Sequence, residues 1–158
     1  MLTKLEQTQR RLAGQNSAVD AWLAARRTLL IRYIALTKSK SLPSAPDIQD
    51  FCQHLVDYAS AGHFEIYHYV VEAFEHASGR RLSLANRIIP RIEQNTERLM
   101  AFHDAYGEIK EDDESLMDLD EHLNELGPLL EERFRLEDRL VAVLDLLDAL
   151  SEAEVTQA

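Results

Sequence analysis

The stretch SAVDAWLAARRTLLIRYIALTKSK, residues 17–40, decides the fold class of this 158-residue chain. Its apolar residues recur every three or four positions, which is the spacing of one helix face. Ser17 is a good N-terminal cap, and Lys38 suits the negative end of the helix dipole. The face is formed by Val19, Trp22, Leu23, Arg26, Leu29, Leu30, Tyr33 and Ile34. The pattern therefore predicts a long helix with Trp22 as a core anchor and with Arg26 as the one polar residue on its apolar face.

Three further long segments carry the same helical spacing, and residues 2–13 carry a shorter version of it. In the first of them Phe51, Leu55 and Tyr58 form the core face, and Gly62 either kinks the helix or ends it; the sequence leaves both open. The three segments are residues 47–77, residues 83–106 with Ser83 as the expected cap and Pro90 as a bend, and residues 116–147 with a kink or restart at Gly127-Pro128. Apolar stripes of this kind pack against one another in helical bundles. We predict an all-α fold, an antiparallel four-helix-type bundle with kinked helices and a short N-terminal helix.

Length and composition indicate one ordinary globular domain over residues 1–158, with an acidic tail from about residue 151 that is expected to fray. The net charge is −11, and residues 108–158 alone carry about −13. Phosphate backbones repel such a chain, whereas a basic protein partner is attracted to it. The chain has one cysteine, Cys52, so no internal disulfide can form. Without a secretory signal or an apolar run long enough to span a membrane, the expected location is the cytoplasm.

Metal binding and catalysis are both disfavoured by the pattern of titratable residues. Glu65, His68, Glu72 and His76 share one helix face, but a two-metal bundle site needs a second E-x-x-H, and none occurs. His63 could act as a general base, yet spacing alone supplies neither a partner nor a substrate pocket. No glycine-rich phosphate loop or nucleophile elbow is present. We therefore expect no metal, no cofactor, no catalytic residues and no enzymatic activity.

A second stripe runs along the same helix as the core face of Phe51, but turned away from it. It places a carboxylate and then a large ring on one face, which is typical of a protein-binding surface. The stripe consists of Asp50, Gln53, Asp57, Ala61 and Phe64. From periodicity, Phe64 either joins this exposed face or turns inward at Gly62. The stripe predicts a partner-binding site around Asp57.

Several longer motifs resemble those of one known family. The run FCQHLVDYASAGHFEIYHYVVEAFE at residues 51–75 carries most of the resemblance. It is accompanied by AVDAWLAARRTLL, RIIPRIEQNTERLM, LEERFRLEDRLVAVLDLL and ALSEAEV, in that order along the chain. Together these motifs are similar to the Rsd/AlgQ family of cytoplasmic anti-sigma regulators, and they extend over nearly the whole chain.

The resemblance implies a helical bundle without catalysis that binds the C-terminal, −35-reading domain of the housekeeping sigma-70 factor. It implies that binding sequesters sigma-70 from RNA polymerase and favours alternative sigma factors as growth slows. The aspartate of the family's LVDY motif, which faces a sigma arginine, corresponds to Asp57, and the aromatic of GHF corresponds to Phe64. His63 and Glu65 are expected as further contacts, with Ala61 on the same face. The alternative is a helical adaptor that regulates a sugar-transport phosphocarrier or an alarmone hydrolase.

Overall fold

The computed structural model describes residues 17–62, Tyr67 and residues 80–157. Four α-helices and one short 3₁₀ helix lie in this part of the chain. They are α2 (Ser17–Lys38), α3 (Ala45–Ala61), α5 (Arg80–Tyr106), η2 (Glu114–Asp118) and α6 (Leu119–Gln157). The predicted all-α fold is confirmed.

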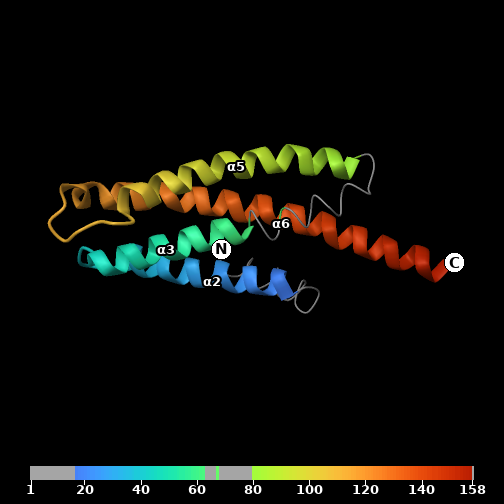
Figure 1. Ribbon diagram of the computed structural model, residues 1–158, viewed down its shortest axis with the longest axis horizontal. Helices are drawn as coiled ribbons and strands as arrows, with labels where there is room; N and C mark the ends of the chain where they lie inside the picture. The colour runs from blue at the N-terminus through green and yellow to red at the C-terminus, as the bar shows by residue number, and fades with distance from the viewer. Residues whose placement is uncertain (1–16, 63–66, 68–79, 158) are drawn as a thin grey trace.

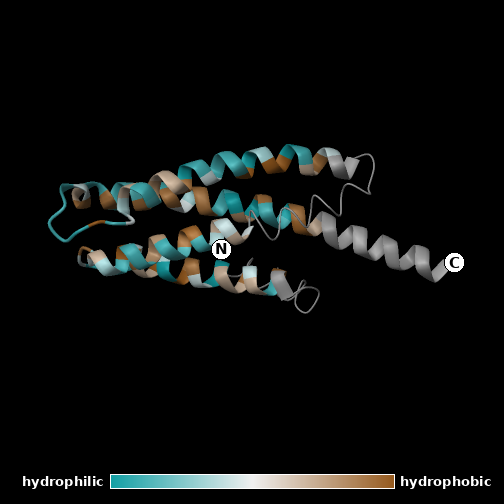
Figure 2. Ribbon diagram, in the orientation of Figure 1, coloured by the Kyte–Doolittle hydropathy of each residue, from teal (hydrophilic) through white to brown (hydrophobic). Residues whose placement is uncertain are grey.

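The helices form an antiparallel bundle in which chain neighbours lie side by side. Figure 1 shows α2 and α3 as one antiparallel pair and α5 and α6 as a second pair. The two pairs join because α3 packs on α5 and α2 packs on α6. Hydrophobic residues face the inside of the bundle, while the connection between α5 and α6 is mostly hydrophilic (Figure 2). None of the described helices is long and apolar enough to cross a membrane.

Helix α3, which carries the candidate binding residues, has a defined start and end. Ser44 caps its N-terminus, since the Ser44 hydroxyl accepts a hydrogen bond from the backbone N–H of Asp47. Pro46 occupies the first turn, where its missing N–H costs nothing. The α-helix ends at Ala61, and Gly62 caps it in a right-handed helical conformation. Because Gly62 and Tyr67 are both π-helical, the structure does not decide between a kink and an end of the helix at Gly62.

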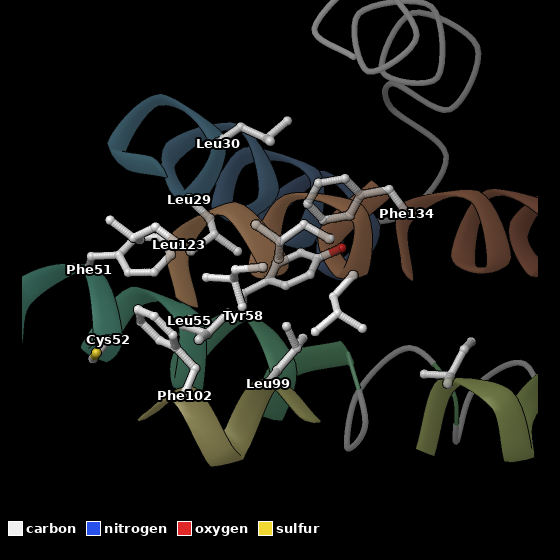
Figure 3. Packing of buried hydrophobic residues seen from close by; sticks show 14 of the residues in the cluster. Leu29, Leu30, Phe51, Cys52, Leu55, Tyr58, Leu99, Phe102, Leu123 and Phe134 are labelled. Atoms are coloured by element: carbon white, nitrogen blue, oxygen red, sulfur yellow. The ribbon is translucent and has the colours of Figure 1, made fainter. Parts of the chain in front are cut away.

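An apolar layer fills the bundle near the α2–α3 turn. Phe51 and Leu55 of α3 meet Leu99 and Phe102 of α5 and Leu123 of α6 there (Figure 3). The rings of Phe51 and Phe102 pack edge to face, with centroids 5.9 Å apart. We call these five residues the apolar layer; each is at most 7% exposed. Their burial confirms the core face that the helical spacing predicts for α3.

The burial predicted for two single residues, Trp22 and Cys52, also agrees with the structure. Trp22 is 1% exposed, so its predicted role as a core anchor is confirmed. Cys52 is a buried free thiol. The helices predicted at residues 2–13 and 63–77 lie outside the described residues. The predicted fraying from residue 151 stays a prediction, as does the single-domain boundary.

The predicted start of α5 is wrong, and of the kink or restart predicted at Gly127-Pro128 the structure excludes the restart. Helix α5 begins at Arg80, so Ser83 lies inside the helix and is not its cap. Helix α6 does not restart at Gly127-Pro128 but continues through Pro128. A side chain from α2 meets it at this point, because the Tyr33 hydroxyl donates to the Leu123 carbonyl oxygen at 2.8 Å. Pro128 cannot donate to the Asn124 carbonyl, and the bond from Tyr33 to the adjacent Leu123 carbonyl joins α2 to α6 where the helix's own hydrogen bonding is interrupted.

Candidate functional site

The outer face of α3 presents an exposed polar stripe to solvent. Asp50, Gln53 and Asp57 are exposed, and Ala61 is half-buried at the end of the helix. The stripe is thus turned away from the core, as its helical phase predicts. Asp57 Oδ1 accepts a hydrogen bond from Gln53 Nε2 at 2.9 Å, one turn earlier on the same face. The Asp57 carboxylate is therefore both accessible and oriented.

A surface ion pair lies two turns before Asp57. Asp50 Oδ2 accepts a hydrogen bond from the Arg32 guanidinium of α2, and both side chains are nearly half exposed. His54 Nε2 is 3.7 Å from the other Asp50 oxygen. The carboxylate of Asp50 is thus paired with the Arg32 guanidinium, whereas Asp57 has the neutral Gln53 as its hydrogen-bond donor.

Beneath this face lies a buried group of charged and polar side chains, and Tyr58, the residue that follows Asp57, belongs to it. We call it the ion cluster; it consists of Arg26 of α2, Tyr58 of α3, Tyr67, and Arg133 and Glu137 of α6. All five side chains are buried, and Glu137 is 0% exposed. Tyr58 donates to Glu137 Oε2, and Tyr67 donates to Glu137 Oε1 at 2.6 Å. Both oxygens of one carboxylate are therefore occupied by tyrosine hydroxyls from the two ends of residues 58–67.

The guanidinium of Arg26 forms one side of the ion cluster. Its Nη2 is 3.1 Å from Glu137 Oε2, its Nη1 is 2.7 Å from Asp138 Oδ1, and its Nε donates to the Tyr58 hydroxyl at 3.1 Å. The ring of Trp22 lies 4.7 Å from the guanidinium carbon and the ring of Phe134 lies 4.8 Å from it. Arg26 is thus stabilised by two carboxylates and by two aromatic faces.

The guanidinium of Arg133 forms the other side. Its Nε is 2.8 Å from Glu137 Oε1, one helical turn away on α6, and its Nη2 donates to the Tyr67 hydroxyl at 3.1 Å. Its Nη1 bonds to two residues of α5, Thr96 Oγ1 at 2.8 Å and Asn95 Oδ1 at 3.3 Å. The ion cluster therefore connects α2, α3, α5 and α6.

The protonation of these groups follows from their burial and their partners. Burial opposes the charge on Arg26, but its interactions with Tyr58, Glu137 and Asp138 together outweigh burial and raise the pKa above the usual arginine value. The pKa of Arg133 is raised in the same way, mainly by Glu137. Burial, reinforced by the nearby carboxylate of Glu137, raises the pKa of both Tyr58 and Tyr67. At neutral pH the arginines are therefore cationic and the tyrosines are hydroxyl donors.

Gly62 lies directly against the ion cluster. A Cβ atom at this position would be 3.2 Å from the Tyr67 hydroxyl oxygen and 3.5 Å from Trp22 Nε1. The first distance is tighter than an ordinary contact, so a larger residue would displace the Tyr67 hydroxyl. The absence of a side chain at Gly62 lets the end of α3 approach Tyr67 and Trp22 closely.

Of the five predicted contact residues, the structure places Asp57 and Ala61, both on the outer face of α3. His63, Phe64 and Glu65 lie outside the described residues, so whether Phe64 is exposed stays open. The four residues of the weighed metal face, Glu65, His68, Glu72 and His76, lie outside them as well. Within the described residues, no group of three histidine, cysteine or acidic side chains could hold a metal.

The sequence pattern did not predict the ion cluster. One signal for it was present, because Arg26 falls on an otherwise apolar helix face. A second signal was the spacing of Arg133 and Glu137, which places them one turn apart on the face that also carries Leu140. What the pattern could not supply was the partner of Arg26, which lies 111 positions further along the chain.

The geometry defines a helical-bundle protein with an exposed acidic helix face above a buried polar centre of two guanidinium groups, one carboxylate and two tyrosine hydroxyls. Comparison with known proteins agrees with this class. The family model described as "Regulator of RNA polymerase sigma(70) subunit, Rsd/AlgQ" matches residues 1–145. The chain belongs to this family.

Curated relatives cover most of the chain. It is 40% identical over 147 residues to the "Regulator of sigma D" of Yersinia pestis bv. Antiqua (strain Angola), covering 89% of this chain and 87% of the relative. The protein of the same name from Yersinia enterocolitica serotype O:8 / biotype 1B is 39% identical, covering 89% and 88%. That from Shigella dysenteriae serotype 1 is 37% identical over 155 residues, covering 94% and 96%. The similarity is thus not confined to one motif or one end of the chain.

Proposed function

We propose that this protein binds the C-terminal, −35-reading domain of the housekeeping sigma-70 factor in the cytoplasm and sequesters it from RNA polymerase. Sequestration would favour alternative sigma factors as growth slows. One observation carries the proposal: Asp57 is an exposed, oriented carboxylate on α3 in a chain of the sigma-70 regulator family. Contacts from Ala61, His63, Phe64 and Glu65 are proposed beside it.

Electrostatics support a basic partner for this face. A domain that places a helix in the DNA major groove carries arginine and lysine side chains for the phosphate backbone. Asp57 bonds to a neutral glutamine, so its charge is available to such an arginine. We expect the affinity to fall as salt rises, since screening acts most on exposed charges.

The names of the family and of the relatives refer to sigma regulation and not to enzymes or transport. They do not favour the alternative partners, a sugar-transport phosphocarrier or an alarmone hydrolase. The same family description supports a role in regulation without catalysis.

The test is calorimetric binding of the purified full chain to the isolated sigma-70 C-terminal domain. Asp57→Ala removes one partner of a charge pair that becomes desolvated in the complex, so the affinity should fall roughly 30-fold or more. Asp57→Arg should bind more weakly still, because like charges would face each other. Asp104→Arg, at an exposed aspartate of α5, is the matched control and should bind within about threefold of the wild type, the residual coming from net charge alone.

A charge-reversal experiment locates the contact. Asp57→Arg is combined with an acidic replacement of each candidate arginine on the sigma domain in turn. Recovery of binding in one combination would place that arginine opposite Asp57. If Asp57→Ala and Asp104→Arg both bind like the wild type, Asp57 is not in the interface and the proposed site is wrong.

A further inference from the structure

The two tyrosine hydroxyls on Glu137 come from residues that bracket most of the proposed contact residues. Tyr58 directly follows Asp57, and Tyr67 follows Glu65 by two positions. Between them lie Ala61, His63, Phe64 and Glu65. Because Tyr58 and Tyr67 donate to the two oxygens of one carboxylate, both ends of this stretch are held at the same buried point.

The carboxylate that receives them is itself fixed. Glu137 is fully buried on α6 and has a guanidinium on each side, Arg26 at 3.1 Å and Arg133 at 2.8 Å. The Arg26 contact is a charge-assisted hydrogen bond and the Arg133 contact is a close ion pair, and a buried carboxylate that lost both would be strongly disfavoured. Glu137 is therefore a rigid reference point for the two tyrosines.

Gly62, in the middle of the stretch, also lies close to the ion cluster. Gly62 lies so close to the Tyr67 hydroxyl that a Cβ there would be 3.2 Å from it. Two hydrogen bonds, from Tyr58 and Tyr67, and the close approach of Gly62 thus place this stretch against Glu137. Asp57 lies at one end of this stretch and on its solvent side.

We propose that Glu137 is a positioning residue for partner binding, acting through Tyr58 and Tyr67 to hold Asp57 and the end of α3 in their binding arrangement. This inference rests on the proposed function, because it concerns the same surface. According to this inference, Glu137, Tyr58 and Tyr67 affect the affinity although they do not contact the partner. Its physical basis is that a binding-competent arrangement populated in only a fraction of molecules weakens the apparent affinity by that fraction.

Hydroxyl deletions test this better than changes at Glu137 itself. Glu137→Gln would leave Arg133 without its carboxylate, so the variant could lose its fold rather than its binding arrangement. Tyr67→Phe removes the donor to Glu137 Oε1 and keeps the ring. Tyr33→Phe is the matched control, because the Tyr33 hydroxyl donates to the Leu123 carbonyl of α6, away from the ion cluster.

The first measurement is calorimetric binding to the sigma-70 C-terminal domain, at a temperature where all variants are folded. Tyr33→Phe should melt roughly 2–4 °C below the wild type, since it loses the bond to the Leu123 carbonyl. Tyr67→Phe should melt somewhat lower, since the Tyr67 hydroxyl both donates to Glu137 and accepts from Arg133. Tyr67→Phe should bind about tenfold more weakly, as expected when only about a tenth of the molecules are binding-competent. Tyr33→Phe should bind within about twofold of the wild type. Equal affinities for the two variants would overturn the inference.

A double-mutant cycle shows whether the effect passes through Asp57. If Tyr67 places Asp57, then Tyr67→Phe should reduce the affinity less in an Asp57→Ala background than in the wild type. An equal reduction in both backgrounds would contradict a positioning role for that contact.

The second measurement needs no partner and separates this inference from the proposed function. Amide hydrogen exchange of the free full-length chain is followed in peptides that cover residues 58–67. Tyr67→Phe should speed exchange there about tenfold, whereas Tyr33→Phe should leave it unchanged. If the wild type fails to bind the sigma domain but this exchange difference is present, the proposed function fails and the positioning role of Glu137 stands. If both variants exchange alike in these peptides, the positioning role fails whatever the binding result.

Discussion

The apolar layer and the ion cluster lie in the same bundle and are buried to the same degree, yet they hold the helices together by different physics. Phe51, Leu55, Leu99, Phe102 and Leu123 contribute through the area that they remove from water, which is non-directional. The ion cluster contributes through directed bonds among Arg26, Tyr58, Tyr67, Arg133 and Glu137. Non-directional burial and precise placement are therefore supplied by separate parts of one core.

The largest expected effect comes from breaking the ion cluster at its centre. Glu137→Ala leaves two buried guanidinium groups without their shared carboxylate, so the free energy of unfolding should fall by about 3–5 kcal/mol. Urea unfolding followed by circular dichroism measures the loss. The control is the combined change Arg26→Met, Arg133→Leu, Glu137→Leu, Tyr58→Phe and Tyr67→Phe. It removes the charges together with the hydroxyls that bond to Glu137, and it should cost less than Glu137→Ala alone. A greater cost for the combined change would mean that the charges themselves stabilise the fold.

In the apolar layer, the expected loss of stability on substitution comes from a cavity and not from an unpaired charge. Leu55→Ala, at a position that is 0% exposed, should lower the free energy of unfolding by about 2–5 kcal/mol. The same urea titration measures it. Because no residue of the apolar layer takes part in the hydrogen bonds to Glu137, amide exchange of residues 58–67 relative to global unfolding should stay unchanged. Selective loosening of those residues by Leu55→Ala would show that the two regions are coupled.

Alkaline pH should destabilise the fold, because the buried Cys52, Tyr58 and Tyr67 side chains keep their protons in the folded chain. Burial raises the pKa of the Cys52 thiol to about 12, and the pKa of both Tyr58 and Tyr67 lies above the usual tyrosine value. Above about pH 9 the unfolded chain loses these protons and the folded chain does not, so stability falls as pH rises, by up to about 1.4 kcal/mol per pH unit and group. Urea midpoints between pH 8 and 11 measure the slope. Cys52→Ala should make that slope shallower from pH 9 upward, and an unchanged slope would contradict the assignment to Cys52.

The smallest effect is expected where the same chemistry lies at the surface. Arg32 and Asp50 form an arginine–carboxylate pair like that of Arg26 and Glu137, but both side chains are nearly half exposed. Asp50→Asn should change the free energy of unfolding by about 0.5 kcal/mol or less. A loss near that of Glu137→Ala would mean that burial does not set the strength of these pairs.

The difference between the two regions also decides what the sequence could predict. The apolar layer was predictable, because Phe51 and Leu55 recur at helical spacing and burial follows from hydrophobicity alone. The exposed position of Asp57 was predictable from the same helical phase. The ion cluster was not, since a directed bond depends on which residue of another helix arrives opposite Arg26, and no local pattern encodes that. The start of α5 was misplaced because Ser83 has the chemistry of a cap but lies one turn inside the helix.

Trp22 is the one tryptophan of the chain, and its surroundings make it an optical reporter. Its indole ring lies 4.7 Å from the Arg26 guanidinium, and its N–H has no hydrogen-bond partner among the described residues. The position that a Cβ of Gly62 would take is 3.5 Å from that N–H. Emission from a ring so placed depends on the field of one cation and on whether water reaches one N–H. The fluorescence of the unlabelled protein is therefore a spectroscopic signal from the end of α3, specific to one ring and recordable in a stopped-flow mixing experiment.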